Sequence, residues 1–165
     1  MTAGVVIRRG HNGPPNSAQG GFACAVFARA TDLAPPLVVT LLAPPPLDTT
    51  CQVVTGARRA TVSAGGTLVA TVSPAGREPD PAPPVSAEEA ETASAGFRGE
   101  TDHPFPTCFV CGHQRRDGTG LRLAPGPVPH RPGMAACLWT PDGHAGDPVP
   151  EEVVWGVLDC PGGWI

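Results

Sequence analysis

The sequence contains no lysine, few charged residues and no long apolar run. All eleven basic residues are Arg, which we attribute to the base composition of a GC-rich genome. No stretch approaches the roughly 18 consecutive apolar residues of a membrane-spanning helix, and the arginines form no run that would follow a phosphate backbone. With a net charge of −4, the chain gives no reason to expect a nucleic-acid or membrane partner.

The sequence is rich in glycine and proline and poor in charged residues. Charged residues make up 16% and apolar residues 41% of the 165 residues, beside 21 glycines and 22 prolines. This much Gly and Pro approaches a low-complexity composition, but the apolar content and low charge favour a folded protein. A chain of this length can bury roughly two thirds of its surface. We expect one domain or two small fused halves.

Six cysteines are present without a recognisable secretory signal. In a secreted chain an even number would suggest disulfides, whereas intracellular thiols stay reduced. We therefore expect a cytoplasmic protein. Three of the cysteines lie in apolar or strand-like surroundings and are predicted to be small buried side chains: Cys24, Cys51 and Cys137.

Residues 1–77 are predicted to form a first structural unit. From Gln19 onward the apolar residues recur at helical spacing, and Asn16 or Ser17 is the expected helix cap. Because many residues of this helix are small, it can lie close against a sheet, and packing must hold it.

Strand-like segments follow this helix. Residues 37–42 are a continuous apolar run, typical of a strand covered on both faces. Further segments lie at 51–57, 60–63 and 67–72, and Gly65-Gly66 is a hairpin signal between the last two. The pattern predicts one helix and an antiparallel meander, an α+β arrangement.

Residues 78–103 are predicted to be a linker, because they are rich in Pro and Glu and poor in large apolar side chains. A short helix over 86–94 is considered within this segment, but little in the sequence supports it.

Residues 104–165 are predicted to form a second, partial unit. Strand candidates lie at 121–123 and 134–139. Pro150 precedes two glutamates, which favours a helix start because proline suits the first turn and acids suit the positive end of the helix dipole. No strands are expected after this helix.

Several motifs resemble a known family when taken as a set. They are GHNGPPNSAQGGF at 10–22, APPPLDT at 43–49, HPFPTCFVCG at 103–112, GLRL at 120–123 and VVWGVLDCPGGW at 153–164. Together they resemble a group of actinobacterial thioesterase-superfamily proteins with a double hotdog fold. The resemblance implies a central helix wrapped by a curled antiparallel sheet in each of two fused halves. The second half is expected to be truncated here, because the strands that should wrap its helix are missing.

The resemblance implies hydrolysis of an acyl-CoA or acyl-carrier thioester, and we expect no cofactor and no metal. Such a reaction needs hydrogen-bond donors for the developing oxyanion and an activated water. Gly20 and Gly21 at a helix start would leave free N–H groups that a carbonyl can approach. The same glycines would also let the helix lie close to the sheet, and the two roles are compatible.

The catalytic acid is expected from the second half. In the first half the matching position is near Arg29, which offers no carboxylate, whereas Asp159 matches it in the second helix. We predict one composite site, with amide donors from Gly20 and Gly21 and a carboxylate from Asp159. In a competing register the second helix begins at Pro161, and Asp159 is then a capping or turn residue.

Polar residues before the glycines are candidates for substrate binding. Asn12, Asn16 and Gln19 are placed to orient the thioester or a water, and His11 titrates near neutrality. The alternatives are that the asparagines are turn formers beside proline and that His11 is a solvated loop residue.

Cys108 and Cys111 form a CxxC motif. A zinc site needs about four ligands, and although His103 and His113 flank the motif, no second CxxC or HxxxH is present. A redox CxxC normally opens a helix beside a strand, which this sequence does not suggest. We predict a structural turn, with metal binding and redox chemistry as alternatives.

Two functions stay open on the sequence: thioester hydrolysis, and a non-catalytic module for acyl-thioester binding or dimerisation. They differ in whether Asp159 faces the Gly20 and Gly21 amides. No GxSxG elbow is present, and Cys160 has no base partner in sequence, so neither Ser nor Cys is expected to act as the nucleophile. We expect a homo-oligomer, because an uncovered second helix carrying Trp155 and Trp164 would expose an apolar patch.

Overall fold

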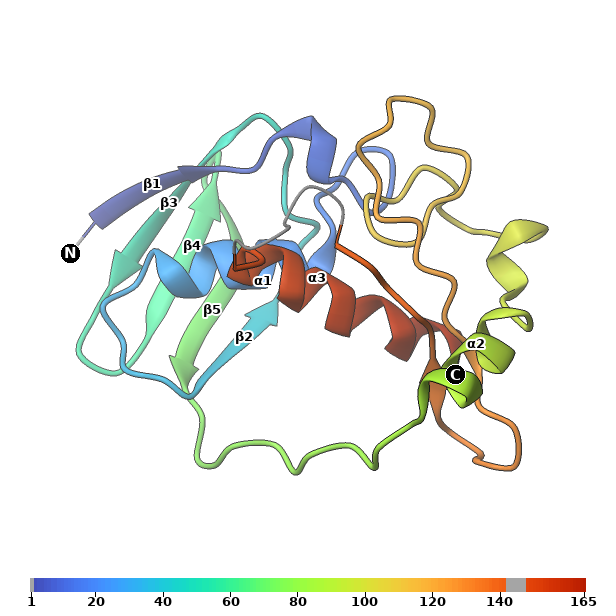
Figure 1. The fold of residues 1–165 in the computed structure, drawn as a ribbon. Helices are drawn as coiled ribbons and strands as arrows, with labels where there is room; N and C mark the ends of the chain where they lie inside the picture. The colour runs from blue at the N-terminus through green and yellow to red at the C-terminus, as the bar shows by residue number, and fades with distance from the viewer. Residues whose placement is uncertain (1, 142–147) are drawn as a thin grey trace.

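A five-stranded antiparallel sheet forms the first part of the molecule (Figure 1). The computed structural model describes residues 2–141 and 148–165. The strands are β1 (Thr2–Val6), β2 (Leu37–Leu41), β3 (Thr50–Thr55), β4 (Ala60–Ala64) and β5 (Thr67–Pro74). They lie in the order β1-β3-β4-β5-β2, and each neighbouring pair is antiparallel. The predicted α+β class and the antiparallel meander are confirmed.

The hairpin between β4 and β5 turns at the predicted glycines. Gly65 and Gly66 have φ angles of +54° and +82°, the left-handed region that glycine enters without steric cost. Two consecutive residues of this kind make the tight turn that matches the twist of two antiparallel strands.

The two edge strands differ from expectation. β1 is a strand that the sequence analysis misses, and it pairs with β3, with Thr2 opposite Val54. The prediction that 37–42 is covered on both faces is wrong. β2 pairs only with β5, and Val38 on its outer face is 48% exposed.

Helix α1 (Gly20–Arg29) packs against the sheet and confirms the helical spacing (Figure 1). Phe22 and Phe27 are buried in one apolar core with side chains from the central strands, including Val53, Val62 and Val72.

The cap of α1 is Gln19. Its Oε1 accepts a hydrogen bond from the backbone N–H of Phe22 at 2.7 Å, which satisfies one of the free donors of the first turn. The prediction that Asn16 or Ser17 caps the helix is therefore wrong.

Residues 78–103 contain more regular structure than a linker. Helix α2 (Ala87–Ser94) lies here, and Arg98–Glu100 form a turn of 3-10 helix. Ser86 and Glu89 form a reciprocal capping box, with hydrogen bonds of 3.1 Å and 2.9 Å. α2 packs on a two-stranded pair made of β6 (Gly126–Pro127) and β7 (Ala135–Ala136). Within this range only the exposed stretch 78–84 resembles the expected linker.

The strands predicted in 104–165 are absent or short. Residues 121–123 form no strand, because Arg122 has a φ of +54°, which breaks an extended ladder. In 134–139 only the two residues of β7 pair. The predicted helix is present as α3 (Glu151–Asp159), followed at once by a 3-10 turn at Cys160–Trp164. The register that starts this helix at Pro161 is therefore wrong.

Helix α3 lies along α1 in the opposite direction (Figure 1). Arg29 at the end of α1 forms an ion pair with Glu152 at the start of α3. At the other end, the start of α1 contacts the last turn of α3. Residues from 97 to 123 share the apolar core of the sheet, so the two parts of the chain are joined by a common interior. Within the described residues, neither β6 nor β7 makes an extensive contact with α3.

Candidate functional site

The last residue of α3, Asp159, meets the first turn of α1. Its Oδ2 accepts a hydrogen bond from the backbone N–H of Gly21 at 3.0 Å and another from Nε2 of Gln19 at 2.7 Å. A carboxylate is favourable here because the first N–H groups of a helix lack internal partners and carry partial positive charge. The three residues of the predicted composite site, Gly20, Gly21 and Asp159, thus lie together.

Gln19 connects the two helices and is only 2% exposed. Its Oε1 caps α1, while its Nε2 donates to Asp159 and lies 3.6 Å from Sγ of Cys160. Both polar ends of this side chain are therefore engaged. Gln19 positions the Asp159 carboxylate and also lines the pocket beside it, and its predicted part in substrate binding stays a prediction.

Gly21 allows the close approach of the helices. A Cβ at this position would lie 2.3 Å from the carbonyl oxygen of Trp155 and 2.6 Å from Cβ of Asp159. At Gly20 the nearest atom to an added Cβ would be Oδ2 of Asp159, at 3.2 Å. The sequence analysis considers close packing of the two glycines on the sheet, but the tight contact at Gly21 is with α3, and the contact at Gly20 is much weaker.

One donor and one acceptor of this junction have no hydrogen-bond partner in the part of the chain that the structure describes. Gly21 donates to Asp159, and Phe22 and Ala23 donate to Gln19. No such bond is found for the Gly20 N–H or for Oδ1 of Asp159 among residues 2–141 and 148–165. These two groups are available to a bound molecule.

A pocket of about 450 Å³ lies beside the carboxylate. Residues from both parts of the chain line it, including Gly20, His103, Phe105, Asp159 and Trp164. A second hollow of about 340 Å³ reaches the same carboxylate and is lined by Gly21, Cys24, Trp155, Leu158 and Asp159. Asp159 therefore lines both hollows.

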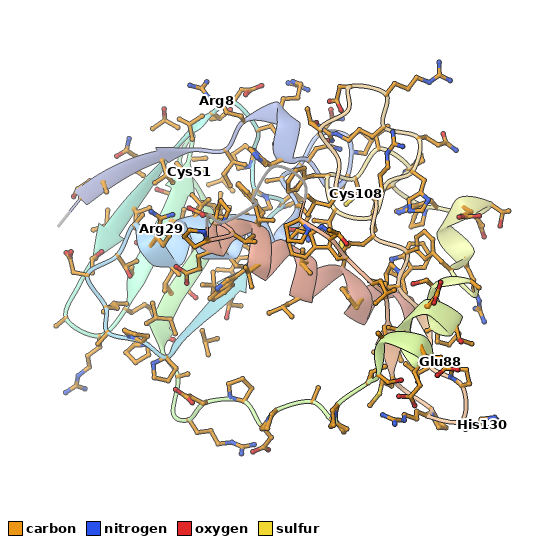
Figure 2. The ribbon with its side chains drawn as sticks, viewed as in Figure 1. Arg8, Arg29, Cys51, Glu88, Cys108 and His130 are labelled. Carbon is orange, nitrogen blue, oxygen red and sulfur yellow. The ribbon has the colours of Figure 1, made fainter. Side chains whose placement is uncertain are left out.

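Three cysteines meet at the first pocket. The Sγ atoms of Cys108, Cys111 and Cys160 all lie within 4.8 Å of one another, and Cys111 and Cys160 are 3.5 Å apart. Figure 2 shows Cys108 among the loops next to α3. Hydrogen bonds from the other two thiols lower the pKa of Cys108, and the same contacts with Cys108 raise the pKa of Cys111 and of Cys160.

The sequence analysis misses this cluster. It treats Cys108 and Cys111 as a turn because no second pair is present, yet α3 brings Cys160 to them across 49 residues. The available signal is that Cys160 directly follows Asp159, so a carboxylate at the pocket places a thiol there too.

The other three cysteines lie outside the cluster. Cys51 is buried, whereas Cys24 and Cys137 are half-buried. Burial raises the pKa of all three, and for Cys24 burial together with the Asp159 charge raises the pKa to about 11. The prediction that these three side chains are buried is confirmed for Cys51 and only in part for Cys24 and Cys137.

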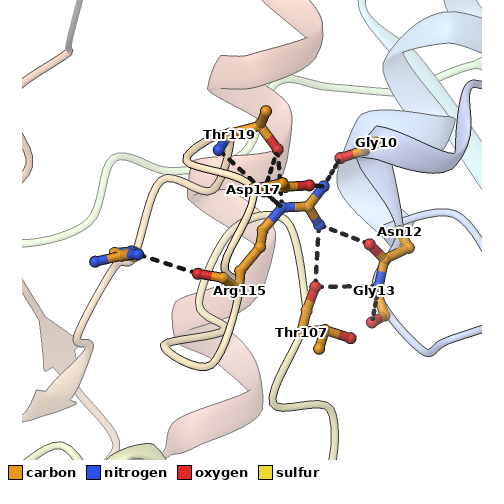
Figure 3. A network of polar contacts seen from close by, with 8 residues as sticks. Gly10, Asn12, Gly13, Thr107, Arg115, Asp117 and Thr119 are labelled. Carbon is orange, nitrogen blue, oxygen red and sulfur yellow. Dashed lines mark hydrogen bonds and ion pairs between the residues drawn. The ribbon is translucent and has the colours of Figure 1, made fainter.

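Asn12 lies in a buried junction and does not line the pocket beside Asp159 (Figure 3). Its Oδ1 accepts from Nη1 of Arg115 at 2.7 Å, and its Nδ2 donates to the carbonyls of Gly13 and Thr107, both at 3.1 Å. The donors predicted to bind substrate are thus spent on holding the 104–112 loop against the first part of the chain. Asn16 is exposed in a turn, away from the pocket lining.

Arg115 is the centre of that junction and is only 6% exposed (Figure 3). Beyond Asn12 its guanidinium donates to the carbonyls of Gly10 and Thr107 and to the side chains of Asp117 and Thr119, at 2.7 to 3.1 Å. A buried guanidinium is tolerated only when its donors are paired in this way. The network fixes the loop that carries the CxxC motif.

His11 packs between aromatic rings. Its ring stacks on Phe22 with centroids 4.1 Å apart and meets Phe109 edge-on at 4.8 Å. Burial, and secondarily the Arg115 charge, lower its pKa, while Glu152 opposes the shift. The reading of His11 as a solvated loop residue is therefore wrong.

Comparisons with known proteins do not identify the chain. Neither protein families, nor curated proteins, nor solved structures give a match. No described helix is long and apolar enough to cross a membrane. A function must therefore come from the geometry around Asp159.

Proposed function

We propose that this protein is an acyl-thioester hydrolase of the hotdog superfamily, acting on acyl-CoA or acyl-carrier substrates. The supporting observation is a carboxylate whose Oδ1, like the neighbouring Gly20 N–H, has no hydrogen-bond partner among the described residues, with Asp159 and Gly20 both lining a pocket of about 450 Å³. Two further observations support the proposal: α1 packs against an antiparallel sheet, as the helix of a hotdog half would, and α3 packs along α1.

The substrate carbonyl is bound by the start of α1. Its oxygen accepts from the Gly20 N–H, and the positive end of the helix dipole stabilises the negative charge that develops on it. Because glycine carries no side chain, the carbonyl can approach this N–H closely. Removing one such donor typically costs about 3–4 kcal/mol of transition-state stabilisation.

The nucleophile is a water held by Asp159. Oδ1 accepts a proton from this water as its oxygen bonds to the carbonyl carbon, while Oδ2 stays anchored by Gly21 and Gln19. Collapse of the tetrahedral oxyanion breaks the C–S bond, and the proton passes from Asp159 to the leaving thiolate. The products are a carboxylic acid and a thiol, and Asp159 returns to its starting state.

The two hollows give room for both ends of a thioester. In the hollow of about 340 Å³, Trp155 and Leu158 offer an apolar surface. In the pocket of about 450 Å³, Phe105 and Trp164 do the same. An acyl chain needs apolar contacts, and a pantetheine arm needs an open path to solvent. The carboxylate borders both spaces.

The second candidate is a module that binds acyl thioesters without turning them over. One observation favours it: Oδ2 of Asp159 occupies the Gly21 N–H, so only one of the two predicted oxyanion donors is free. In this case the pocket retains substrate affinity, and Asp159 serves as a cap between two helices.

A pair of Gly20 substitutions tests the hydrolase. Gly20 is the first residue of α1, where proline is well tolerated, and Gln19 before it has a ψ of 133°, which proline accepts. Gly20→Pro removes the N–H and adds a ring, whereas Gly20→Ala adds the Cβ alone and keeps the N–H, so that the alanine variant controls for the added Cβ. A panel of acyl-CoAs with a thiol-reactive dye should show turnover in wild type and Gly20→Ala, and a loss of about 100-fold or more in Gly20→Pro.

Binding measured by calorimetry on the same panel separates the two functions. Saturable acyl-CoA binding without thiol release in wild type would establish the binding module. Equal turnover in Gly20→Pro and Gly20→Ala would refute the oxyanion role of this amide.

A further inference from the structure

Cys108, Cys111 and Cys160 have the geometry of a thiolate metal site. The first two are each 4% exposed, and Cys160 lies where α3 passes into the following 3-10 turn. Tetrahedral zinc with Zn–S bonds of about 2.3 Å places its sulfurs about 3.8 Å apart. The Cys111–Cys160 separation is 3.5 Å and all three sulfurs are within 4.8 Å of one another, so the cluster needs shifts of less than about 1 Å to close on an ion.

The CxxC turn is shaped to present thiolates. The sulfurs of Cys108 and Cys111 lie within 4.8 Å of each other across this turn, a separation that one zinc ion can bridge with small shifts. Gly112 donates to the Cys108 carbonyl at 3.0 Å, and a Cβ there would lie 2.4 Å from the Cys108 nitrogen. Only glycine fits where the chain folds back over the first cysteine.

His103 supports the cluster from its side. Its Nδ1 accepts from the Phe105 N–H at 2.9 Å, so Nε2 carries the proton. Nε2 then donates to the carbonyl and sulfur of Cys111, at 3.0 Å and 3.3 Å. His103 is thus a hydrogen-bond donor to a ligand, and a fourth coordination position is left to a water or ligand from the pocket that all three cysteines line.

We propose that Cys108, Cys111 and Cys160 bind one zinc ion, with His103 donating a hydrogen bond to Cys111. Three thiolates favour Zn²⁺ over Mg²⁺ or Ca²⁺, which prefer oxygen ligands. The ion would fasten the end of α3 to the CxxC turn and so hold the neighbouring Asp159 at the start of α1. Metal binding is measured without substrate, so this inference stands or fails separately from the proposed hydrolase.

The test uses the full chain under reducing conditions, stripped of metal by a chelator. Titration with Co²⁺ as a spectroscopic probe should give one equivalent per chain, with thiolate-to-metal charge-transfer absorption in the near ultraviolet. Zn²⁺ should displace the Co²⁺ and abolish this absorption. Addition of a mercurial to the Zn²⁺-loaded wild type should release one equivalent of Zn²⁺, which an indicator dye reports.

Cysteine variants assign the ligands. Cys160→Ser should weaken metal binding by at least about 100-fold, whereas Cys137→Ser, at a half-buried cysteine outside the cluster, should bind as wild type does. His103→Ala should still bind, with affinity reduced by about 10- to 100-fold. If a variant fails to fold, the release of Zn²⁺ from the wild type by a mercurial still tests the proposal.

Three results would overturn the proposal. One is a wild type that takes up no Co²⁺ or Zn²⁺. Another is Cys160→Ser that binds as tightly as wild type. The third is a Cys111–Cys160 disulfide that persists under reduction and precludes metal uptake.

Discussion

The carboxylate of Asp159 accepts a hydrogen bond of 3.0 Å from the backbone N–H of Gly21, across a sequence separation of 138 residues. This contact joins the last residue of one helix to the first turn of another that runs in the opposite direction. At the far ends of the same helices, Arg29 and Glu152 form an ion pair (Figure 2 shows Arg29). The helix pair is thus fastened at both ends, and the contact nearer the pocket carries the proposed chemistry.

Gly21 and Gly20 should differ sharply in their tolerance of alanine. A Cβ at Gly21 meets backbone of α3 at 2.3 Å, so Gly21→Ala must push the helices apart and should cost about 2–3 kcal/mol of unfolding free energy. Gly20→Ala meets only a carboxylate oxygen at 3.2 Å and should change stability by less than about 1 kcal/mol. Urea denaturation measures both. Equal stability of the two variants would contradict the close helix packing.

Arg115 should contribute strongly to stability. Arg115→Ala leaves the buried Oδ1 of Asn12 and the carbonyl of Gly10 without this donor and removes one of the two donors to the Thr107 carbonyl, and we expect a loss of about 2–3 kcal/mol. The neighbouring Arg116 is exposed, so Arg116→Ala should stay within about 0.5 kcal/mol of wild type. Chemical denaturation of both variants is the measurement, and a loss below about 1 kcal/mol in Arg115→Ala would show that the network is not needed.

Stability should fall as the pH drops below the ordinary titration range of His11. Burial, then Arg115, lower its pKa in the folded state, with Glu152 opposing, so the unfolded chain takes up a proton before the folded chain does. Stability therefore rises with pH through the window from the lowered folded pKa to about 6.5, the unfolded value. His11→Phe keeps the ring stacking and cannot titrate.

Unfolding free energies at pH 5 and pH 7.5 test this linkage. His11→Phe should lose less stability than wild type on acidification, whereas His130→Gln, at an exposed loop position, should behave as wild type does. An unchanged pH dependence in His11→Phe would show that His11 is not a source of the acid sensitivity.

How much the sequence could predict varies with how local the signal is. The spacing of α1, the Gly65-Gly66 turn and the start of α3 after Pro150 depend on adjacent residues, and the structure has all three. The strand at 121–123 fails for a local reason that its apolar alternation hides, the positive φ of Arg122.

Features that need distant partners escape the sequence. β1 is a five-residue strand whose partner lies about fifty residues away, as Thr2 opposite Val54 shows. Cys160 reaches the CxxC turn only because α3 carries it there. The resemblance could place Asp159 with the glycines at the helix start. Only the structure shows that its Oδ2 is bound by the Gly21 N–H, while its Oδ1 has no hydrogen-bond partner among the described residues. By contrast, the capping box of Ser86 and Glu89 is local and was readable, though few apolar residues support that helix.

Self-association should depend on the exposed face of α3. Val154 and Leu158 are 37% and 73% exposed one turn apart, whereas Trp164 packs on Phe97 and His103 and does not contribute the expected patch. We expect a homo-oligomer in which this face is covered. Leu158→Glu should weaken association by about tenfold or more, and Leu138→Glu, at another exposed apolar position, should not. Sedimentation equilibrium decides, and a monomeric wild type would contradict the expectation.

The most direct test of the proposed hydrolase is the turnover of Asp159→Asn beside Glu151→Gln. Asparagine keeps the shape of Asp159 and can still accept from Gly21, so the fold should be retained, while the base is lost. Glu151 is an exposed acid at the other end of the same helix and serves as the matched control. On the best acyl-CoA of the panel, kcat of Asp159→Asn should fall by about 100-fold or more, with circular dichroism unchanged and Glu151→Gln near wild type. Wild-type turnover in a folded Asp159→Asn protein would contradict the assignment of Asp159 as the base.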